Sequence, residues 1–568
     1  MSGLELYKLG NLKIRRLKMK ITSIILVIIL HSNSVVRSQL SKRIPPEKPK
    51  LIVGIIIEQM RHDYINRYWD KFGEGGFKRL LNEGTYCKNA NFNYLFTQTA
   101  VGHATIATGT TPSYHGIVSE EWYVRLKDKV INCVLDDKEK TIGGSYEAGR
   151  MSPRQLLTTT IGDEIRLASF GKSKVMAISL QGKSAILSAG QTAYSAYWFD
   201  DETGKWVSST YYMKDLPTWA TSFNDKKFAD IYMTRSWETK FPLAEYANRS
   251  LPDDNKYEVG IEGKRTFPYN LTQIGNIDKN KMKFSLLRYT PFGNTYTKDF
   301  AIQAIVSDSL GKDDYTDMLT VSFSATEFIG QNFGPESVEM MDAFIKLDED
   351  LEHFLNFLDQ EIGKQNILVY LTSDHGAAQN PDYLADKGIP VGYFSQNSAL
   401  SLLKSYLNAI YGRGDWVKNY YAQQLFLNRD LIEDSKLNLA DFQQKVAQFL
   451  LQFTGVANTV TATTLQTTYF PDGVFSKIQK SYNQKRSGDV LINLDPGWIE
   501  KNGTTTSHNS SYAYDAHVPL IWYGWKVKRA TINEFVDMTD IAPTISYFLN
   551  ISSPNAAVGK PILGLVGQ

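Results

Sequence analysis

Unbroken apolar runs that stop at acidic residues constrain the fold of this chain more than any other feature. The run 51-LIVGIII-57 ends at Glu58 and has the length and β-branching of a strand buried on both faces. Similar strands are expected in 317-DMLTVSFSATE-327 and in 366-NILVYLTSDHG-376. A fourth, 517-HVPLIWYGW-525, begins at its polar residue, where the others end. These runs are typical of a sheet that is covered on both sides.

A helical pattern separates the second and third of these strands. In 337-SVEMMDAFIKLDEDLEHFLNFLDQ-360 the apolar residues recur three and four positions apart, which predicts an amphipathic helix. Buried strands that alternate with such helices predict an α/β fold with a mostly parallel sheet. The 568 residues show no Pro- or Ser-rich linker and no internal repeat. We therefore expect one large domain with insertions rather than several domains.

The first 38 residues have the pattern of a secretory signal peptide. The basic segment 13-KIRRLKMK-20 precedes the apolar run 21-ITSIILVIIL-30, and small residues at 36 and 38 suit cleavage after Ser38. The run is shorter than the roughly 20 residues that a membrane-spanning helix needs. Residues 1–38 hold seven Lys or Arg and one Glu, so their removal changes the net charge from +2 to −4. The predicted mature chain, 39–568, is therefore exported, and nucleic acid is not an implied partner.

Acidic residues and a histidine gather where the predicted strands end. In open α/β sheets, ligands bind outside the carboxyl ends of the strands, and Glu58, Glu327, Asp374 and His375 all fall there. Three converging carboxylates would repel one another without a cation, so the pattern favours a divalent metal site. The alternative is that each acid caps the helix that follows it.

The order of the motifs resembles the alkaline phosphatase superfamily, most closely the secreted phosphate-irrepressible alkaline phosphatases and the nucleotide pyrophosphatase/phosphodiesterases. The strand-ending acid is followed by 97-TQTAVGH-103, by 373-SDHG-376 and by 514-YDAHVP-519. The resemblance covers nearly the whole mature chain. It implies a three-layer sandwich with a mostly parallel central sheet and cap insertions near 196–300 and 378–510.

The resemblance also implies site residues. Thr99 matches the nucleophile that forms a phospho-threonine, and a divalent metal is one means of activating such a hydroxyl. The neighbouring Thr97, Thr105 and Thr108 are interpreted as turn or helix-cap hydroxyls, and His103 as structural. By resemblance the metal ligands are Glu58, Thr99, Asp374 and His375 for one ion, and Glu327, Gln331 and His517 for the other.

Several of these positions depart from the family pattern. Glu replaces Asp at 58 and 327, and Gln331 offers a neutral amide where the family has His. Among the substrate-contacting positions, Glu120 replaces Asn, Gln181 replaces Lys and Lys183 replaces Arg. Where a phosphoryl group binds, Glu120 adds a negative charge and Gln181 removes a positive one, while Lys183 keeps its charge but lacks the planar fork of Arg. One divalent ion, zinc by resemblance, is therefore expected, and the second site is expected to be weak.

Two functions follow from these residues. The first is an exported, metal-dependent hydrolase of phosphate monoesters or diesters, with weak or altered activity. The second is a catalytically degenerate member that acts as a binding or scaffold protein, with a protein partner, in the periplasm or cell envelope of a bacterium. The zinc content of the mature chain would discriminate between them. The sequence leaves open whether Cys87 and Cys133 form a disulfide.

Overall fold

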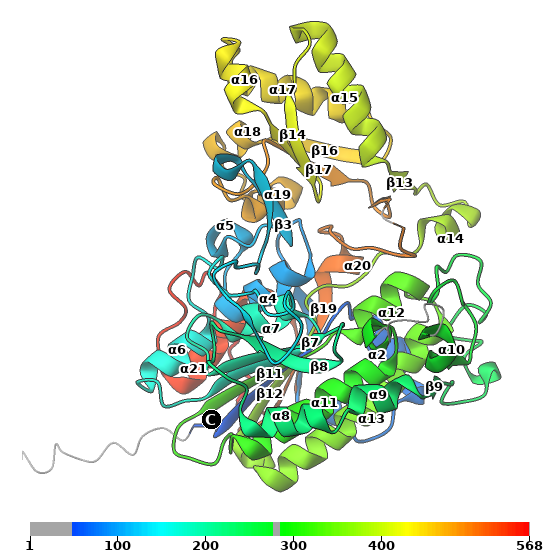
Figure 1. Cartoon of the computed structure of the whole chain (residues 1–568), viewed down its shortest axis with the longest axis vertical. Helices are drawn as coiled ribbons and strands as arrows, with labels where there is room; N and C mark the ends of the chain where they lie inside the picture. The colour runs from blue at the N-terminus through cyan, green and yellow to red at the C-terminus, as the bar shows by residue number, and fades with distance from the viewer. Residues whose placement is uncertain (1–47, 276–283, 502, 567–568) are drawn as a thin grey trace, which may run out of the picture. The chain divides into compact units, whose positions relative to one another are not determined.

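A ten-stranded mixed sheet forms the centre of the protein (Figure 1). The computed structural model describes residues 48–275, 284–501 and 503–566. Parallel pairing runs from β12 through β1, β11 and β6 to β7, and β19 is antiparallel to both of its neighbours. The predicted α/β fold with a mostly parallel sheet is confirmed. The strands lie in the order β20 (Ala530–Asp537), β2 (Thr85–Asn91), β19 (His517–Gly524), β12 (Ile367–Thr372), β1 (Leu51–Ile57), β11 (Asp317–Phe323), β6 (Val175–Ser179), β7 (Ser195–Asp200), β8 (Lys205–Ser209) and β5 (Thr141–Ile142).

Strand β1 shows why the apolar runs are unbroken. Leu51, Val53 and Ile55 pack into one hydrophobic cluster, while Ile52 and Ile56 pack into a second one on the other face. Both faces of the strand are therefore buried, and a polar residue fits only beyond its end.

Helices cover both faces of the sheet and give it three layers (Figure 1). The helices on the Ile52 face are α4 (Thr99–Thr108), α6 (Ile161–Ala168), α7 (Gly182–Ala189) and α21 (Ile541–Leu549). The helices on the Leu51 face are α2 (Tyr64–Arg67), α3 (Phe77–Glu83), α8 (Thr218–Asp225), α9 (Phe228–Met233), α11 (Pro291–Ser307), α12 (Ala325–Phe333) and α13 (Val338–Glu361). The last of these is the helix predicted over 337–360.

A smaller sheet with its own core lies within the segment between β12 and β19. Leu403, Val446 and Ile492 belong to its separate hydrophobic cluster. We call this region, within the expected insertion at 378–510, the cap. Its strands lie in the order β14 (Val417–Tyr421), β15 (Gln424–Leu427), β17 (Val490–Leu494) and β16 (Val456–Thr461). Its helices are α15 (Gln396–Tyr411), α16 (Arg429–Asp434), α17 (Leu439–Leu450), α18 (Ala462–Thr467) and α19 (Gly473–Ser481).

The other expected insertion, near 196–300, is placed differently by the structure. Strands β7 and β8 continue the central sheet, so the inserted part begins after β8. The aromatic residues Tyr197 and Trp206 on these strands pack in the core with Phe300 of α11. The remaining short elements are α5 (Pro112–His115), β3 (Glu121–Val124), β4 (Lys129–Asn132), β9 (Ser236–Trp237), β10 (Tyr269–Asn270), α10 (Leu271–Gly275), α14 (Pro381–Asp386), β13 (Tyr393–Phe394), β18 (Ile499–Glu500) and α20 (Ala513–Ala516).

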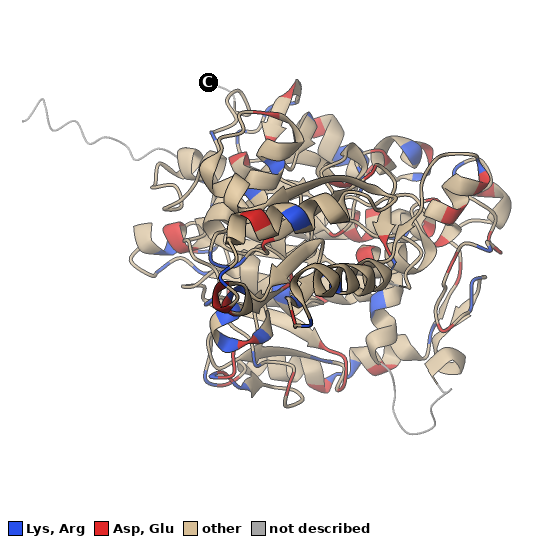
Figure 2. Cartoon of the chain, turned by 90° about the horizontal axis from the view of Figure 1, so that it is seen from above, with Lys and Arg blue, Asp and Glu red and all other residues tan. Residues whose placement is uncertain are grey.

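Three further predictions concern export, membrane-spanning helices and the two cysteines. The predicted signal peptide, 1–38, lies outside the described residues. Within the described part of the chain, no helix is both long enough and apolar enough to cross a membrane. Cys87 and Cys133 are both buried and are free thiols, so they do not form the disulfide that the sequence left open. In the view of Figure 2, basic and acidic residues are mixed throughout the fold rather than segregated by sign.

Candidate active site

Thr99 begins α4 and is fully buried. Its Oγ1 donates a hydrogen bond to Glu327 Oε1 at 2.9 Å and lies 3.3 Å from His375 Nε2. The free N–H groups of a helix N-terminus favour an anion beside them. The expected nucleophile therefore lies between a carboxylate and an imidazole, at a helix end that suits negative charge.

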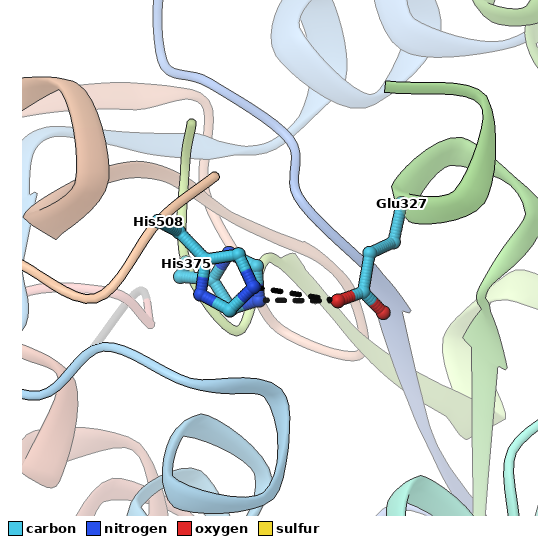
Figure 3. Close-up of side chains that lie close together, drawn as sticks. All are labelled: Glu327, His375 and His508. Atoms are coloured by element: carbon cyan, nitrogen blue, oxygen red, sulfur yellow. Dashed lines mark ion pairs between the residues drawn. The ribbon is translucent and has the colours of Figure 1, made fainter. Parts of the chain in front are cut away.

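Glu327, His375 and His508 form a triad that could hold a metal ion (Figure 3). One ligand atom of each lies within 4.8 Å of the others. The two imidazoles stack with centroids 3.7 Å apart, and their Nε2 atoms lie 3.9 and 3.5 Å from Glu327 Oε1. Their Nδ1 atoms contact backbone carbonyls, at 2.8 Å for Gly376 and 2.6 Å for Thr97. Because each Nδ1–H donates a hydrogen bond to one of those carbonyls, both Nε2 atoms face the centre as candidate ligand atoms.

The charges within the triad are unevenly distributed. Burial lowers the pKa of His375 well below its usual value, and the neighbouring His508 lowers that pKa further. Burial also lowers the pKa of His508, but its hydrogen bond to Glu327 and the charges of Glu327 and Asp515 together outweigh burial and raise the pKa. Burial raises the pKa of Glu327, yet His508 and the charge of Lys183 hold that pKa below its usual range. The Nε2 proton of His508 is the one that an incoming cation would displace.

Glu58 lies beside the triad, but hydrogen-bond donors of the chain contact both of its oxygens. Oε1 accepts from Ser322 Oγ at 2.7 Å and from Ser324 Oγ at 2.8 Å, while the Gln181 amide donates to Oε2. The same Gln181 Nε2 donates to Glu327 Oε2 at 2.6 Å. The two hydrogens of one neutral amide thus join two carboxylates that the resemblance assigns to two metal sites.

Asp374 has one satisfied oxygen and one unsatisfied oxygen. Its Oδ1 accepts from the backbone N–H groups of Gln59 and His375, at 3.0 and 2.9 Å. Its Oδ2 has no hydrogen-bond partner among the described residues and lies 3.5 Å from His375 Nε2. Burial raises the pKa of Asp374 well above its usual value, and Glu58 and Glu327 add to the shift. Asp374 Oδ2 is therefore a further candidate ligand atom next to His375, outside the triad.

Glu120 and Lys183, two of the predicted substrate-binding residues, pair with each other. Burial lowers the pKa of Lys183, but the charges of Glu120 and Glu327 outweigh this and raise the pKa. Gln98 holds the Glu120 segment in place, because its Oε1 accepts from Ser119 Oγ and from the Glu120 backbone N–H, each at 2.9 Å. The positive charge of Lys183 is thus already neutralised within the protein.

A cavity of about 410 Å³ connects this centre with the cap. Glu327, His508 and Lys183 line it from the core, and Tyr420 and Tyr421 of β14 line it from the cap. A ligand that reaches Thr99 through this cavity would therefore meet the aromatic side chains of the cap.

The structure changes the predicted ligand set at His517. Its Nε2 contacts the carbonyl of Lys88 at 2.8 Å, and its ring stacks on His62 with centroids 3.8 Å apart. It begins β19 next to β2 and is not part of the triad. Gln331 does reach the centre, where its Nε2 donates to Glu327 Oε1 at 3.1 Å. In the structure His508, and not His517, lies with Glu327 and His375 as the third candidate metal ligand.

His508 is the candidate ligand residue that the sequence analysis missed. It lies in 503-GTTTSHNSS-511, a run of small polar residues that joins the cap to the last core strands. The sequence feature that could have indicated His508 is a histidine in a polar loop just before the motif 514-YDAHVP-519. His103, interpreted as structural, contacts Ser188 Oγ at 3.0 Å through Nδ1 and lies 3.4 Å from Glu58 Oε1 through Nε2.

Comparisons with known proteins identify the family to which the chain belongs. A family model described as type I phosphodiesterase / nucleotide pyrophosphatase matches residues 52–515. The chain is 40% identical over 528 residues to a Myroides odoratus protein named calcium-transporting ATPase, covering 92% of this chain and 95% of the relative. It is 39% identical to the alkaline phosphatase PafA of Elizabethkingia meningoseptica, covering 92% and 95%. The crystal structure of wild-type PafA matches with a TM-score of 0.87 at 38% identity, covering 92% and 99%. The chain therefore belongs to the type I phosphodiesterase/nucleotide pyrophosphatase family of the alkaline phosphatase superfamily.

Proposed function

We propose that this chain is an exported phosphoric ester hydrolase that depends on one divalent cation, uses Thr99 as its nucleophile and acts weakly on phosphate monoesters. One observation carries the proposal: Thr99 Oγ1 lies at the start of α4, within 2.9 Å of Glu327 and 3.3 Å of His375. This is the arrangement that an activated hydroxyl nucleophile needs. The signal-peptide pattern supports an exported location, in the periplasm or cell envelope.

Glu327, His375 and His508 are the residues that would hold the cation. Two imidazole nitrogens and one carboxylate oxygen form a donor set that suits zinc. When bound there, a divalent cation supplies Lewis-acid chemistry, lowering the pKa of a nearby hydroxyl and polarising a phosphoryl oxygen.

The protein's own groups provide the remaining steps. Thr99 Oγ1 attacks phosphorus as the bond from phosphorus to the leaving oxygen breaks, and the Thr99 proton ends on the departing alkoxide, which leaves as the alcohol. The N-terminus of α4 favours the phosphoryl charge that then lies on Thr99. Water afterwards attacks phosphorus and releases phosphate, or a phosphate monoester when the substrate is a diester, and one of its protons restores the Thr99 hydroxyl.

The charges around the site set the expected substrate. Glu58, Glu120 and Glu327 lie around the centre, while Lys183 is paired with Glu120 and Gln181 carries no charge. A dianionic monoester therefore meets less positive charge than its transition state needs. A singly charged diester is less penalised.

A second candidate is a catalytically degenerate binding or scaffold protein of the envelope with a protein partner. The Gln181 amide favours it, because that amide already occupies one oxygen each of Glu58 and Glu327. In this case the fold is retained without the chemistry.

Metal analysis and turnover of purified residues 39–568 test the proposal. We expect fewer than two zinc ions per chain after dialysis, and faster hydrolysis of an aryl phosphodiester than of an aryl phosphate. Two tightly held zinc ions would contradict the single-cation centre. No turnover of either ester, with the protein folded and loaded with zinc, would leave the second candidate as the better account.

A further inference from the structure

Two residues just before the nucleophile hold the loop that carries His508. The His508 Nδ1–H donates to the carbonyl of Thr97 at 2.6 Å. The side-chain amide of Gln98 donates to Asn509 Oδ1 at 3.0 Å. Thr97 Oγ1 donates to the carbonyl of Ser510 at 2.8 Å and accepts from the Ser510 N–H at 3.1 Å. Three consecutive residues of the loop are therefore fixed to the segment that leads into α4.

The backbone of Asn509 shows that this loop is held rather than relaxed. Its φ is 101°, in the left-handed region that residues with a side chain rarely adopt. Such a conformation costs about 1–3 kcal/mol and persists only where the surrounding contacts impose it. A second contact comes from Gln423 of the cap, whose side-chain amide donates to the Asn509 carbonyl at 3.1 Å. The loop is thus fixed from the core and from the cap.

Asp515 adds a third anchor. Its Oδ2 accepts from the Ser510 N–H at 3.0 Å and from the Ser510 Oγ at 2.6 Å. The Ser510 N–H is therefore shared between Asp515 and the Thr97 hydroxyl. Asp515 is buried and lies in α20, just before β19. All of these bonds come from the chain itself, so they can place His508 at the triad before a cation arrives.

The Thr97 hydroxyl does not cap α4, although its place in the sequence favoured a turn or cap. The residue that precedes the helix is Gln98, and its side chain makes no capping hydrogen bond. Both hydrogen bonds of the Thr97 hydroxyl reach Ser510, which is 413 residues further along the chain. This hydroxyl therefore joins two distant segments rather than starting the helix.

We propose that Thr97 and Asn509 are positioning residues that hold His508 in the geometry of the triad, so that the cation site is formed in advance. The inference rests on the cation that the proposed function assigns to Glu327, His375 and His508, and it does not depend on turnover. A histidine ligates a metal ion only with a suitable tautomer and ring orientation, and the outer residues that set them typically change metal affinity about 10–100-fold. Without these contacts, part of the binding energy of the cation is needed to order the loop.

The zinc affinity of the purified mature chain, 39–568, measures this role. Competition with a chromogenic chelator gives the Kd of the wild type and of each variant. Thr97→Val keeps the shape of the side chain but removes its hydroxyl, and it should weaken zinc binding at least about tenfold. Thr97→Ser restores the hydroxyl and should bind zinc like the wild type. The matched control is Thr108→Val, which removes a buried hydroxyl that donates to Ala104 within α4 at 2.7 Å, and it should leave the zinc Kd unchanged.

Asn509→Gly separates positioning from stability. Glycine adopts a φ of 101° without strain, which offsets the lost bond from Gln98, so the Tm of the zinc-free protein should stay within about 2 °C of the wild type. Zinc binding should nevertheless weaken at least about fivefold, because a glycine at this position lets the loop leave its held conformation. A merely structural role would change the Tm and leave the zinc Kd unchanged.

The outcomes distinguish this inference from the proposed function. If Thr97→Val and Asn509→Gly fold and bind zinc as tightly as the wild type, the positioning role is overturned, even where the wild type hydrolyses an ester. A wild type that binds no zinc would overturn both. Weaker zinc binding in the two variants, with recovery in Thr97→Ser, would support the positioning role even in a protein without turnover.

Discussion

Two pairs of buried glutamates, Glu58 with Glu327 beside the central sheet and Glu258 with Glu339 beside the insertion, differ in what surrounds their oxygens. The first pair accepts hydrogen bonds from serine, threonine and glutamine side chains, and one amide joins its two members. Three of the four oxygens of the second pair have no donor. Both pairs are buried, so the difference lies in the neighbours rather than in solvent.

The comparison separates two ways of accommodating buried negative charge. In the first pair, side-chain donors of the chain have taken positions that the resemblance assigns to cations and to phosphate contacts. In the second pair nothing has done so, and protons must supply the balance, since burial raises the pKa of both carboxyls. A centre whose carboxylates already have partners gains less from a metal ion, which explains why we expect one tightly bound ion at the triad and not two.

The largest expected effect on activity comes from replacing Glu58, Glu327 and four neighbouring residues of the site by the residues that the family has at those positions. The combined variant should raise phosphate monoesterase activity by about three orders of magnitude, since each lost donor costs about 2 to 4 kcal/mol and the effects overlap. Steady-state rates with an aryl phosphate measure the change. The substitutions are Glu58→Asp, Glu327→Asp, Gln331→His, Glu120→Asn, Gln181→Lys and Lys183→Arg.

The two halves of this set serve as controls for each other. The metal-ligand changes alone, or the phosphate-contact changes alone, should fall well short of the full set, because metal activation and charge stabilisation act on one transition state. A six-fold variant that folds, binds two metals and still fails to hydrolyse the ester would show that these residues do not explain the low activity.

Removal of the nucleophile is the next largest change. Thr99→Ala should reduce diester turnover at least about a hundredfold, because no other hydroxyl contacts both Glu327 and His375 in the described centre. Thr99→Ser, which keeps the hydroxyl, should retain activity, and both variants should unfold at the wild-type Tm. Turnover that survives in Thr99→Ala, at the wild-type zinc content, would exclude Thr99 from the mechanism.

A substitution of Gln181 tests whether its side-chain amide stabilises the two carboxylates in place of a bound cation. Gln181→Ala leaves two buried carboxylate oxygens without a donor, which should destabilise the zinc-free protein by about 2 kcal/mol. Zinc should recover more stability in this variant than in the wild type. Urea unfolding with chelator and with zinc measures both values. Gln452→Ala, at an exposed position, is the control and should show neither effect.

The sequence allowed the sheet and the edge residues to be predicted because both depend on local patterns. A strand buried on two faces must be apolar throughout, so β1 and its acidic end were readable from one segment. Asp374 and His375 come just after β12, and Glu327 lies in the first turn of the helix that follows β11, so all three meet at the same edge. Their convergence follows from the topology of any open parallel sheet.

The choice between His508 and His517 could not be read in this way. His517 begins a strand, and its surroundings depend on the pairing of β19 with β2, where it stacks on His62. His508 lies in a loop whose path is set by distant contacts, including the Thr505 N–H to the Gln331 carbonyl at 2.7 Å. The ion pair between Glu120 and Lys183 could not be predicted either. The residue types at these two positions do not reveal that the side chains contact each other.

The smallest expected effect concerns His115. Like the first pair of glutamates, this buried ionisable side chain has hydrogen-bond partners within the protein. Its Nδ1 accepts from the Ile117 N–H at 3.1 Å and its Nε2 lies 3.2 Å from Thr105 Oγ1, so the ring is held neutral. Burial, with a smaller contribution from Arg486, lowers its pKa to about 3. The unfolded chain, with an ordinary histidine pKa, therefore binds a proton near pH 6.5 that the folded protein does not. Stability from this residue is complete above that pH and falls by up to about 1.4 kcal/mol per pH unit below it. Urea unfolding at pH 7.5, 6 and 5 should show a shallower decline in His115→Gln than in the wild type, whereas equal slopes would mean that the internal hydrogen bonds do not keep this ring neutral.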